Sequence, residues 1–127
     1  MKIIKTLFRH HKIMLLIAIF ITISIAILGL VKFDSPPVKI KHFDKIEHSI
    51  AYFFLTLFWL ISFRKRNSLL IIVVCFFYGI LIEVSQEVFT THRVGEYYDI
   101  IANLIGVLLA FILFNAFFYK KDSFSEK

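Results

Sequence analysis

The sequence predicts an all-α integral membrane protein, a four-helix bundle with both termini in the cytoplasm. Three observations support this fold class. Hydrophobic residues make up 59% of the 127 residues, 16 of which are Phe, and the mean hydropathy is +0.81. A soluble domain of this size needs more polar surface than that. Four long apolar segments also follow one another, separated by short charged linkers, and we expect them to form a single domain over residues 1–127.

The first helix is expected over residues 13–31. Ile13 to Val31 is a run of nineteen residues without a charge, and at 1.5 Å per residue it covers about 28 Å, close to the hydrocarbon thickness of a bilayer. Basic residues before an apolar run also fit a signal peptide. We expect an uncleaved anchor instead, because the run is longer than a usual signal peptide core and no small-x-small cleavage site precedes Lys32.

Three further helices are expected over residues 46–63, 69–89 and 99–119, each apolar except near one end. Pro36-Pro37 ends the first helix and forces an extended path to the second. A tight turn over residues 64–68 and a loop containing Gly95 supply the other connections. The single Cys75 excludes an intrachain disulfide.

The basic residues set the expected orientation. With both termini inside, ten of the 15 Lys and Arg lie on the cytoplasmic side, and only Lys32, Lys39, Lys41, Lys45 and Arg93 lie outside. The net charge of +6 is therefore a topology signal and gives no reason to expect nucleic acid as a partner. The expected partner is the lipid bilayer.

Ionisable and amide groups interrupt three of the apolar helices, where they mark either interhelical pairs or a functional site. They recur at helical spacing, so each of these helices carries one polar stripe. The stripes are Asp44, Glu47, His48 and Tyr52 on the second helix, Gly79, Glu83, Gln86 and Glu87 on the third, and Asp99, Asn103 and Gly106 on the fourth.

The three stripes should meet at one depth in the membrane. Glu83 lies about 9 Å below the end of its helix and Asn103 about 6 Å below Asp99, so antiparallel packing brings the two level. Gly79 and Gly106 would let the third and fourth helices approach closely. A polar pocket open to the outer surface follows, with His92 and Arg93 overhead.

These motifs resemble the VanZ-like family, small bacterial membrane proteins named after a protein that confers teicoplanin resistance. The resemblance covers about residues 32–118, which omits the first helix, and Thr91-His92 replaces a frequent Pro-Gly turn. It implies a multi-pass protein of the bacterial cytoplasmic membrane with a link to cell-envelope or glycopeptide physiology. It does not supply a reaction or a cofactor. The motifs are Asp44-Lys45-Ile46-Glu47-His48 with Tyr52, Gly79-x3-Glu83-x2-Gln86, Arg93, and Asp99-x2-Ala102-Asn103-x2-Gly106.

The pocket is expected to bind an envelope lipid or a lipophilic or glycopeptide ligand. Lys45 and Arg93 would attract a phosphate while the groove between helices takes an acyl or prenyl chain. The expected ligand-binding residues are Asp44, Lys45, Glu47, Tyr52, Gln86, Glu87, Arg93 and Asn103.

Acid-base catalysis on a lipid headgroup at the outer leaflet is the first alternative. His48 would transfer the proton, Glu83 or Asp99 would orient it, and Arg93 or Lys45 would stabilise negative charge. One histidine with acids is a weak metal-ligand set, so no metal is expected.

A purely structural cluster is the second alternative, in which Asn103 pairs with Gln86 across the helices. It explains Glu83 and Glu87 less well, because hydrogen bonding between helices does not require two carboxylates one turn apart. A proton-coupled or ion-conducting assembly is a third, and it would require a homo-oligomer.

Topology can be tested by cysteine labelling. In a background with Cys75 replaced by Ala, a cysteine at Gly95 should react with a membrane-impermeant thiol reagent on intact cells, and one at Arg66 should not. Labelling at Arg66 alone would place the polar pocket on the cytoplasmic side.

Overall fold

The computed structural model describes residues 2, 6, 9–30, 43–63, 67–89 and 97–119, and for residues 43, 44, 118 and 119 only the backbone. Over these residues the elements are helices, as predicted. They are α2 (His11–Leu30), α3 (Phe43–Ser62), α4 (Ser68–Phe89), α5 (Tyr97–Phe114) and η1 (Asn115–Tyr119), a π-helical turn that continues α5.

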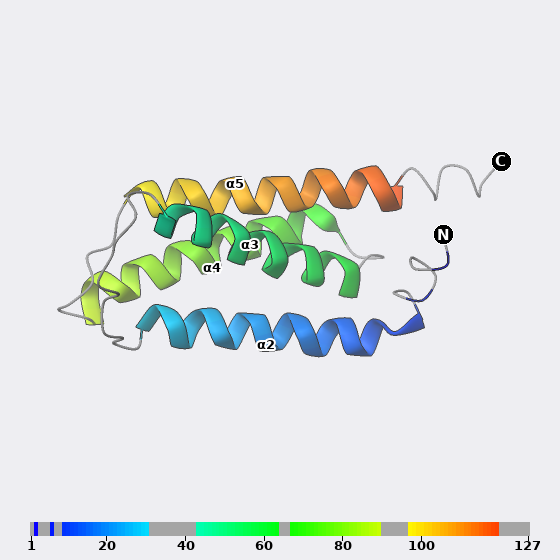
Figure 1. The fold of residues 1–127 in the computed structure, drawn as a ribbon, viewed down its shortest axis with the longest axis horizontal. Coiled ribbons are helices and arrows are strands. Elements are labelled where there is room, and N and C mark those ends of the chain that lie inside the picture. Colours follow the sequence, from blue (N-terminus) through cyan, green and yellow to red (C-terminus); the bar gives the residue numbers. More distant parts are fainter. Residues whose placement is uncertain are drawn as a thin grey trace.

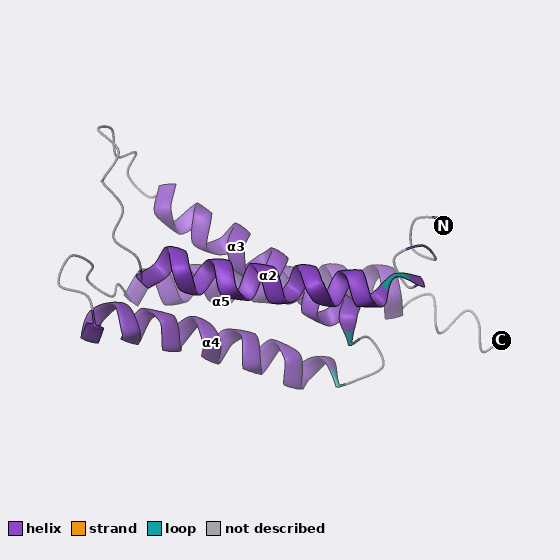
Figure 2. Cartoon of the chain, turned by 90° about the horizontal axis from the view of Figure 1, so that it is seen from below, coloured by secondary structure: helices purple, strands orange, loops and turns teal. Residues whose placement is uncertain are grey.

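The helices lie side by side (Figure 1), and successive helices run in opposite directions. α3 and α5 are therefore parallel and pack most extensively on each other, while α2 packs against α3 and α4. Figure 2 shows α3 and α4 on opposite sides of α2. This order brings the first turns of α3 and α5 to the same end as the last turns of α2 and α4.

Three of the described helices are long and apolar enough to cross a membrane, namely α2, α4 and the continuous segment Tyr97–Phe117. Their outer surfaces carry large exposed apolar side chains, including Phe20 (71% exposed), Leu81 (61%) and Ile112 (63%). Such faces suit contact with lipid hydrocarbon and would be unfavourable in water. The prediction of a membrane protein is thus supported by the surface as well as by the composition.

α3 is the least apolar of the four helices, because its first turns carry Asp44, Lys45 and Glu47. We expected it to span the membrane as the others do, yet it is not among the three helices that meet the requirements of length and hydropathy. It contacts each of the other helices instead. Four of the six largest fully buried side chains lie on it: Tyr52, Leu55, Thr56 and Leu60.

The closest backbone approach joins α3 to α5 at Gly106. A Cβ atom there would collide with the carbonyl oxygen of Ser49, and the Ser49 hydroxyl donates to the Ala102 carbonyl at 2.8 Å. We expected Gly106 to face the third apolar segment, which is α4, and that expectation was wrong. Gly79 of α4 does face α5, because a Cβ there would lie 3.1 Å from Asn103 Nδ2.

Substitution of Gly106 by Ala should therefore destabilise the protein. The collision is with backbone, so relief requires α3 and α5 to separate, at a cost of about 1–3 kcal/mol that outweighs the higher helix propensity of Ala. Thermal unfolding in detergent should show a lower midpoint for Gly106→Ala than for Ile105→Ala, whose side chain is 48% exposed. Equal midpoints would show that the α3–α5 contact is looser than described.

Candidate functional site

A cluster of polar side chains lies where the first turns of α3 and α5 meet the last turns of α4. The alternating helix directions bring it together from distant parts of the sequence. Three of its members are almost completely enclosed, with exposures of 3% for Glu83, 7% for Asp99 and 1% for Asn103. His48 and Lys45 of α3 complete the cluster.

His48 is the centre of this cluster. Its Nδ1 atom donates to Asn103 Oδ1 at 3.1 Å and lies 3.7 Å from Glu83 Oε1, while its Nε2 atom lies 3.8 Å from Asp99 Oδ2. The imidazole ring thus connects α3 to both α4 and α5. Asp99 also accepts a hydrogen bond from Lys45 Nζ at 3.2 Å.

The arrangement meets the electrostatic requirement of the two buried carboxylates. A buried carboxylate without a cationic or hydrogen-bonding neighbour loses its hydration at a large free-energy cost. Glu83 and Asp99 are both buried, and both lie beside groups from α3 that carry or can accept a positive charge. α3 therefore supplies side chains that can compensate both carboxylates.

The donor atoms of His48, Glu83 and Asp99 all lie within 4.8 Å of one another, a spacing that could hold a metal ion. The two carboxylates, however, approach different nitrogens of the ring. One ion binds one ring nitrogen, so these contacts fit an imidazole bridging two carboxylates better than a shared ion. We therefore interpret the cluster as a hydrogen-bonded and ionic network.

Tyr52, one of the expected ligand-binding residues, lies next to this group. Tyr52 is 2% exposed, and its hydroxyl, like Asn103 Nδ2, has no hydrogen-bond partner among the described residues. Both side chains border Gly79. The purely structural alternative pairs Gln86 with Asn103; in the structure, Gln86 Nε2 donates to the carbonyl oxygen of Gly29 of α2 at 2.9 Å.

Two other predicted site residues, Glu47 and Glu87, lie apart from the network. Glu47 is exposed on α3, and Glu87 is exposed although it is one turn from buried Glu83. Of these two carboxylates one turn apart, one is therefore buried and one is exposed. The side chain of Asp44 and the whole of Arg93 lie outside the described residues.

A pocket of about 270 Å³ opens beside His48, between α2, α3 and α4. Our sequence analysis gave α2 no part in the site. The signal for it was Gly29, a lone glycine near the end of an apolar helix, where a Cβ would press on Ile82 at 3.0 Å and on Gln86 at 3.1 Å. The lining residues are Ile25, Leu28, Gly29, Glu47, His48, Ala51, Tyr52, Ile82 and Gln86.

Fold and site together define a helical membrane protein with a buried polar network at one end. The chain belongs to the VanZ/LLP1 family, whose family model matches residues 3–119. The predicted VanZ-like resemblance is thereby confirmed, and the match includes the first helix, which we had left out.

The chain is also similar to a fission yeast protein, "Uncharacterized protein C11E3.10" of Schizosaccharomyces pombe. The two are 36% identical over 110 residues, which is 83% of this chain and 65% of the relative. The chain thus spans somewhat less than two thirds of that protein's length. No solved structure matches the chain.

Replacement of Asp99 by Asn should test the network. The change removes the charge that faces both Lys45 and His48, and hydrogen bonds to charged groups contribute about 1.5–3 kcal/mol. The midpoint of thermal unfolding should fall clearly for Asp99→Asn and hardly at all for Glu87→Gln, because Glu87 is exposed. A similar small effect of both changes would mean that the network contributes little to stability.

Proposed function

We propose that the pocket beside His48 binds the polar part of a membrane lipid or of a similarly lipophilic molecule. The observation that carries this proposal is the composition of its walls. Glu47, His48 and Gln86 offer polar groups, while Leu28 and Ile82 offer apolar surface in the same cavity. Ligand pockets of this kind combine apolar walls with a few polar groups that fix orientation.

The unsatisfied hydroxyl of Tyr52 supports binding over a purely structural role. A buried tyrosine hydroxyl normally has a hydrogen-bond partner, because leaving it unpaired costs free energy. The Tyr52 hydroxyl has none among the described residues, and Tyr52 lines the pocket. A bound polar group would supply the missing partner, whereas a cluster that served only to join helices would pair its own members.

The VanZ-like resemblance leads us to propose the cytoplasmic membrane of a bacterium as the location. The Lys and Arg distribution leads us to propose that both termini are inside and that the polar network lies toward the envelope. The family likeness extends to fission yeast. The proposal therefore rests on lipids that bacterial and fungal membranes share. A glycopeptide ligand of the teicoplanin type finds no support in the lining residues of this pocket.

Acid-base chemistry on a bound headgroup is a second candidate function, favoured by the position of His48. The ring lines the pocket and lies between two carboxylates, one near each nitrogen. A histidine oriented by a carboxylate on one nitrogen can transfer a proton through the other.

Lipid retention tests the binding proposal. Leu28 is 56% exposed and lines the pocket, whereas the adjacent Ile27 is 52% exposed and does not. Native mass spectrometry of the purified chain should show retained lipid, severalfold less with Leu28→Trp, and an unchanged amount with Ile27→Trp. Absence of retained lipid in the unmodified chain, or equal retention in both variants, would contradict the proposal.

A change in lipid composition distinguishes acid-base chemistry from lipid binding. If His48 performs acid-base chemistry, overproduction of the chain should change the amount of one lipid class in the membrane, and His48→Gln should reduce that change by about 10²-fold at equal protein abundance. Under binding alone, overproduction of either protein should leave the lipid composition as it was.

A further inference from the structure

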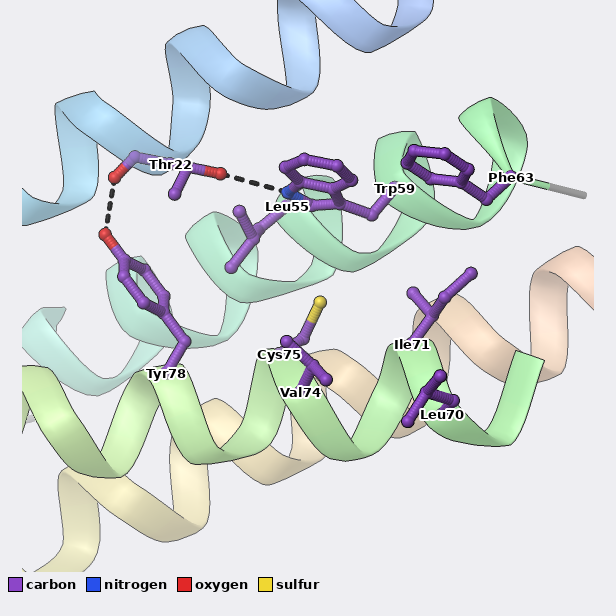
Figure 3. Close-up of a pocket in the computed structure, with 9 residues that line it drawn as sticks. All are labelled: Thr22, Leu55, Trp59, Phe63, Leu70, Ile71, Val74, Cys75 and Tyr78. Carbon is purple, nitrogen blue, oxygen red and sulfur yellow. Dashed lines mark hydrogen bonds between the residues drawn. The ribbon is translucent and has the colours of Figure 1, made fainter. Parts of the chain in front are cut away.

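A second cavity lies next to the polar pocket along the same three helices. It also measures about 270 Å³ and lies between α2, α3 and α4, nearer the opposite end of these helices. In Figure 3, Leu55 and Trp59 of α3 face Val74 and Cys75 of α4 across it. We call this cavity the apolar groove.

The polar groups around the apolar groove are already engaged with one another. Trp59 Nε1 donates to the Thr22 hydroxyl at 3.0 Å, and the Tyr78 hydroxyl donates to the Thr22 carbonyl at 2.5 Å (Figure 3). The groove therefore offers hydrocarbon, aromatic ring and sulfur surface to an occupant. Only a hydrocarbon chain or another apolar group matches such walls.

The polar pocket and the apolar groove are about one helical turn apart on all three helices. The residue that lines the pocket and the one that lines the groove are Ile25 and Thr22 on α2, Tyr52 and Leu55 on α3, and Ile82 and Tyr78 on α4.

The two cavities together are as long as one lipid molecule. From Glu47 in the pocket to Phe63 in the groove, α3 rises about 24 Å. One bilayer leaflet with its headgroups is about 20–22 Å thick. The combined length therefore suits one lipid molecule lying along α3.

The charges of the pocket restrict the headgroup. Among the described lining residues, Glu47 contributes a carboxylate and none is Lys or Arg. We expected Lys45 to attract a phosphate, but its Nζ atom lies 3.2 Å from Asp99 and it does not line the pocket. A carboxylate at the mouth favours an ammonium group, while His48, Tyr52 and Gln86 can hydrogen-bond a phosphodiester or hydroxyl.

We propose that the polar pocket and the apolar groove form one site for a single phospholipid with an ammonium headgroup, of the phosphatidylethanolamine class. The headgroup amine lies at Glu47, and one acyl chain runs past Tyr78 into the groove beside Trp59 and Val74. This inference rests on the proposed function and adds to it the charge of the headgroup and the path of the chain.

The path of the acyl chain can be measured by fluorescence, because Trp59 is the only tryptophan of the protein and it lines the groove. Brominated acyl chains quench tryptophan fluorescence on contact. The full chain is reconstituted in phosphatidylcholine nanodiscs with increasing fractions of brominated phosphatidylethanolamine or brominated phosphatidylglycerol. We expect quenching that saturates at a low fraction of the ethanolamine lipid, half-maximal at about tenfold less than for the glycerol lipid, a ratio that corresponds to about 1.4 kcal/mol.

A matched pair of variants and one single variant then test the parts of the site separately. Val74 is 58% exposed and lines the groove, and Val73 is 40% exposed and does not. Val74→Phe should remove the saturable quenching and lower the number of ethanolamine lipids retained in native mass spectrometry, whereas Val73→Phe should change neither. Glu47→Gln should abolish the preference between headgroups and leave the saturable quenching in place.

Each contrary result overturns a defined part of the proposal. Equal half-maximal fractions for the two headgroups in the unmodified chain would refute the ammonium assignment. Equal behaviour of Val74→Phe and Val73→Phe would refute the path through the groove. If quenching of the unmodified protein rises only linearly with the fraction of brominated lipid while the protein still retains lipid in native mass spectrometry, this inference alone is overturned. If the unmodified protein retains no lipid, the proposed function is overturned as well.

Discussion

The burial of Glu83 and Asp99 is the constraint on which the rest of this structure depends. Each carboxylate lies within an apolar helix end and is less than a tenth exposed. In such surroundings a charge must be compensated locally or neutralised. His48 and Lys45 of α3 provide the compensation. α3, the least apolar helix, is thereby held against α4 and α5, and its close contact with α5 at Gly106 aligns the two parallel helices.

The alignment has consequences for the possible function. Once α3 is fixed by the network, its side chains line both the polar pocket and the apolar groove, together with those of α2 and α4. α2 is attached to α3 by the bond from Trp59 to Thr22, and to α4 by the bonds from Tyr78 to Thr22 and from Gln86 to Gly29. The network thus organises a neighbouring surface on which a lipid could bind. The family match over residues 3–119 includes all of these helices.

Helical periodicity made the polar network partly predictable. Spacings of three and four residues assigned His48, Glu83 and Asn103 to stripes, and the rise per residue brought the stripes to one depth. Periodicity identifies a face of a helix but not the neighbour that it meets. For that reason Gly106 was assigned to the wrong neighbour, and Gln86 was paired with Asn103 although it reaches Gly29 of α2. Glu87 is exposed although it lies one turn from buried Glu83 on the same stripe, so a shared stripe does not ensure burial.

A double-mutant cycle measures directly whether His48 couples α3 to α4 through Glu83. The free energy of unfolding is determined for the unmodified chain, His48→Gln, Glu83→Gln and the double variant. Residues that share a network interact by about 0.5–3 kcal/mol, so we expect the effect of the two changes together to differ from the sum of their separate effects by at least 0.5 kcal/mol. Additive effects would show that the two side chains are independent and that His48 does not couple the helices through Glu83.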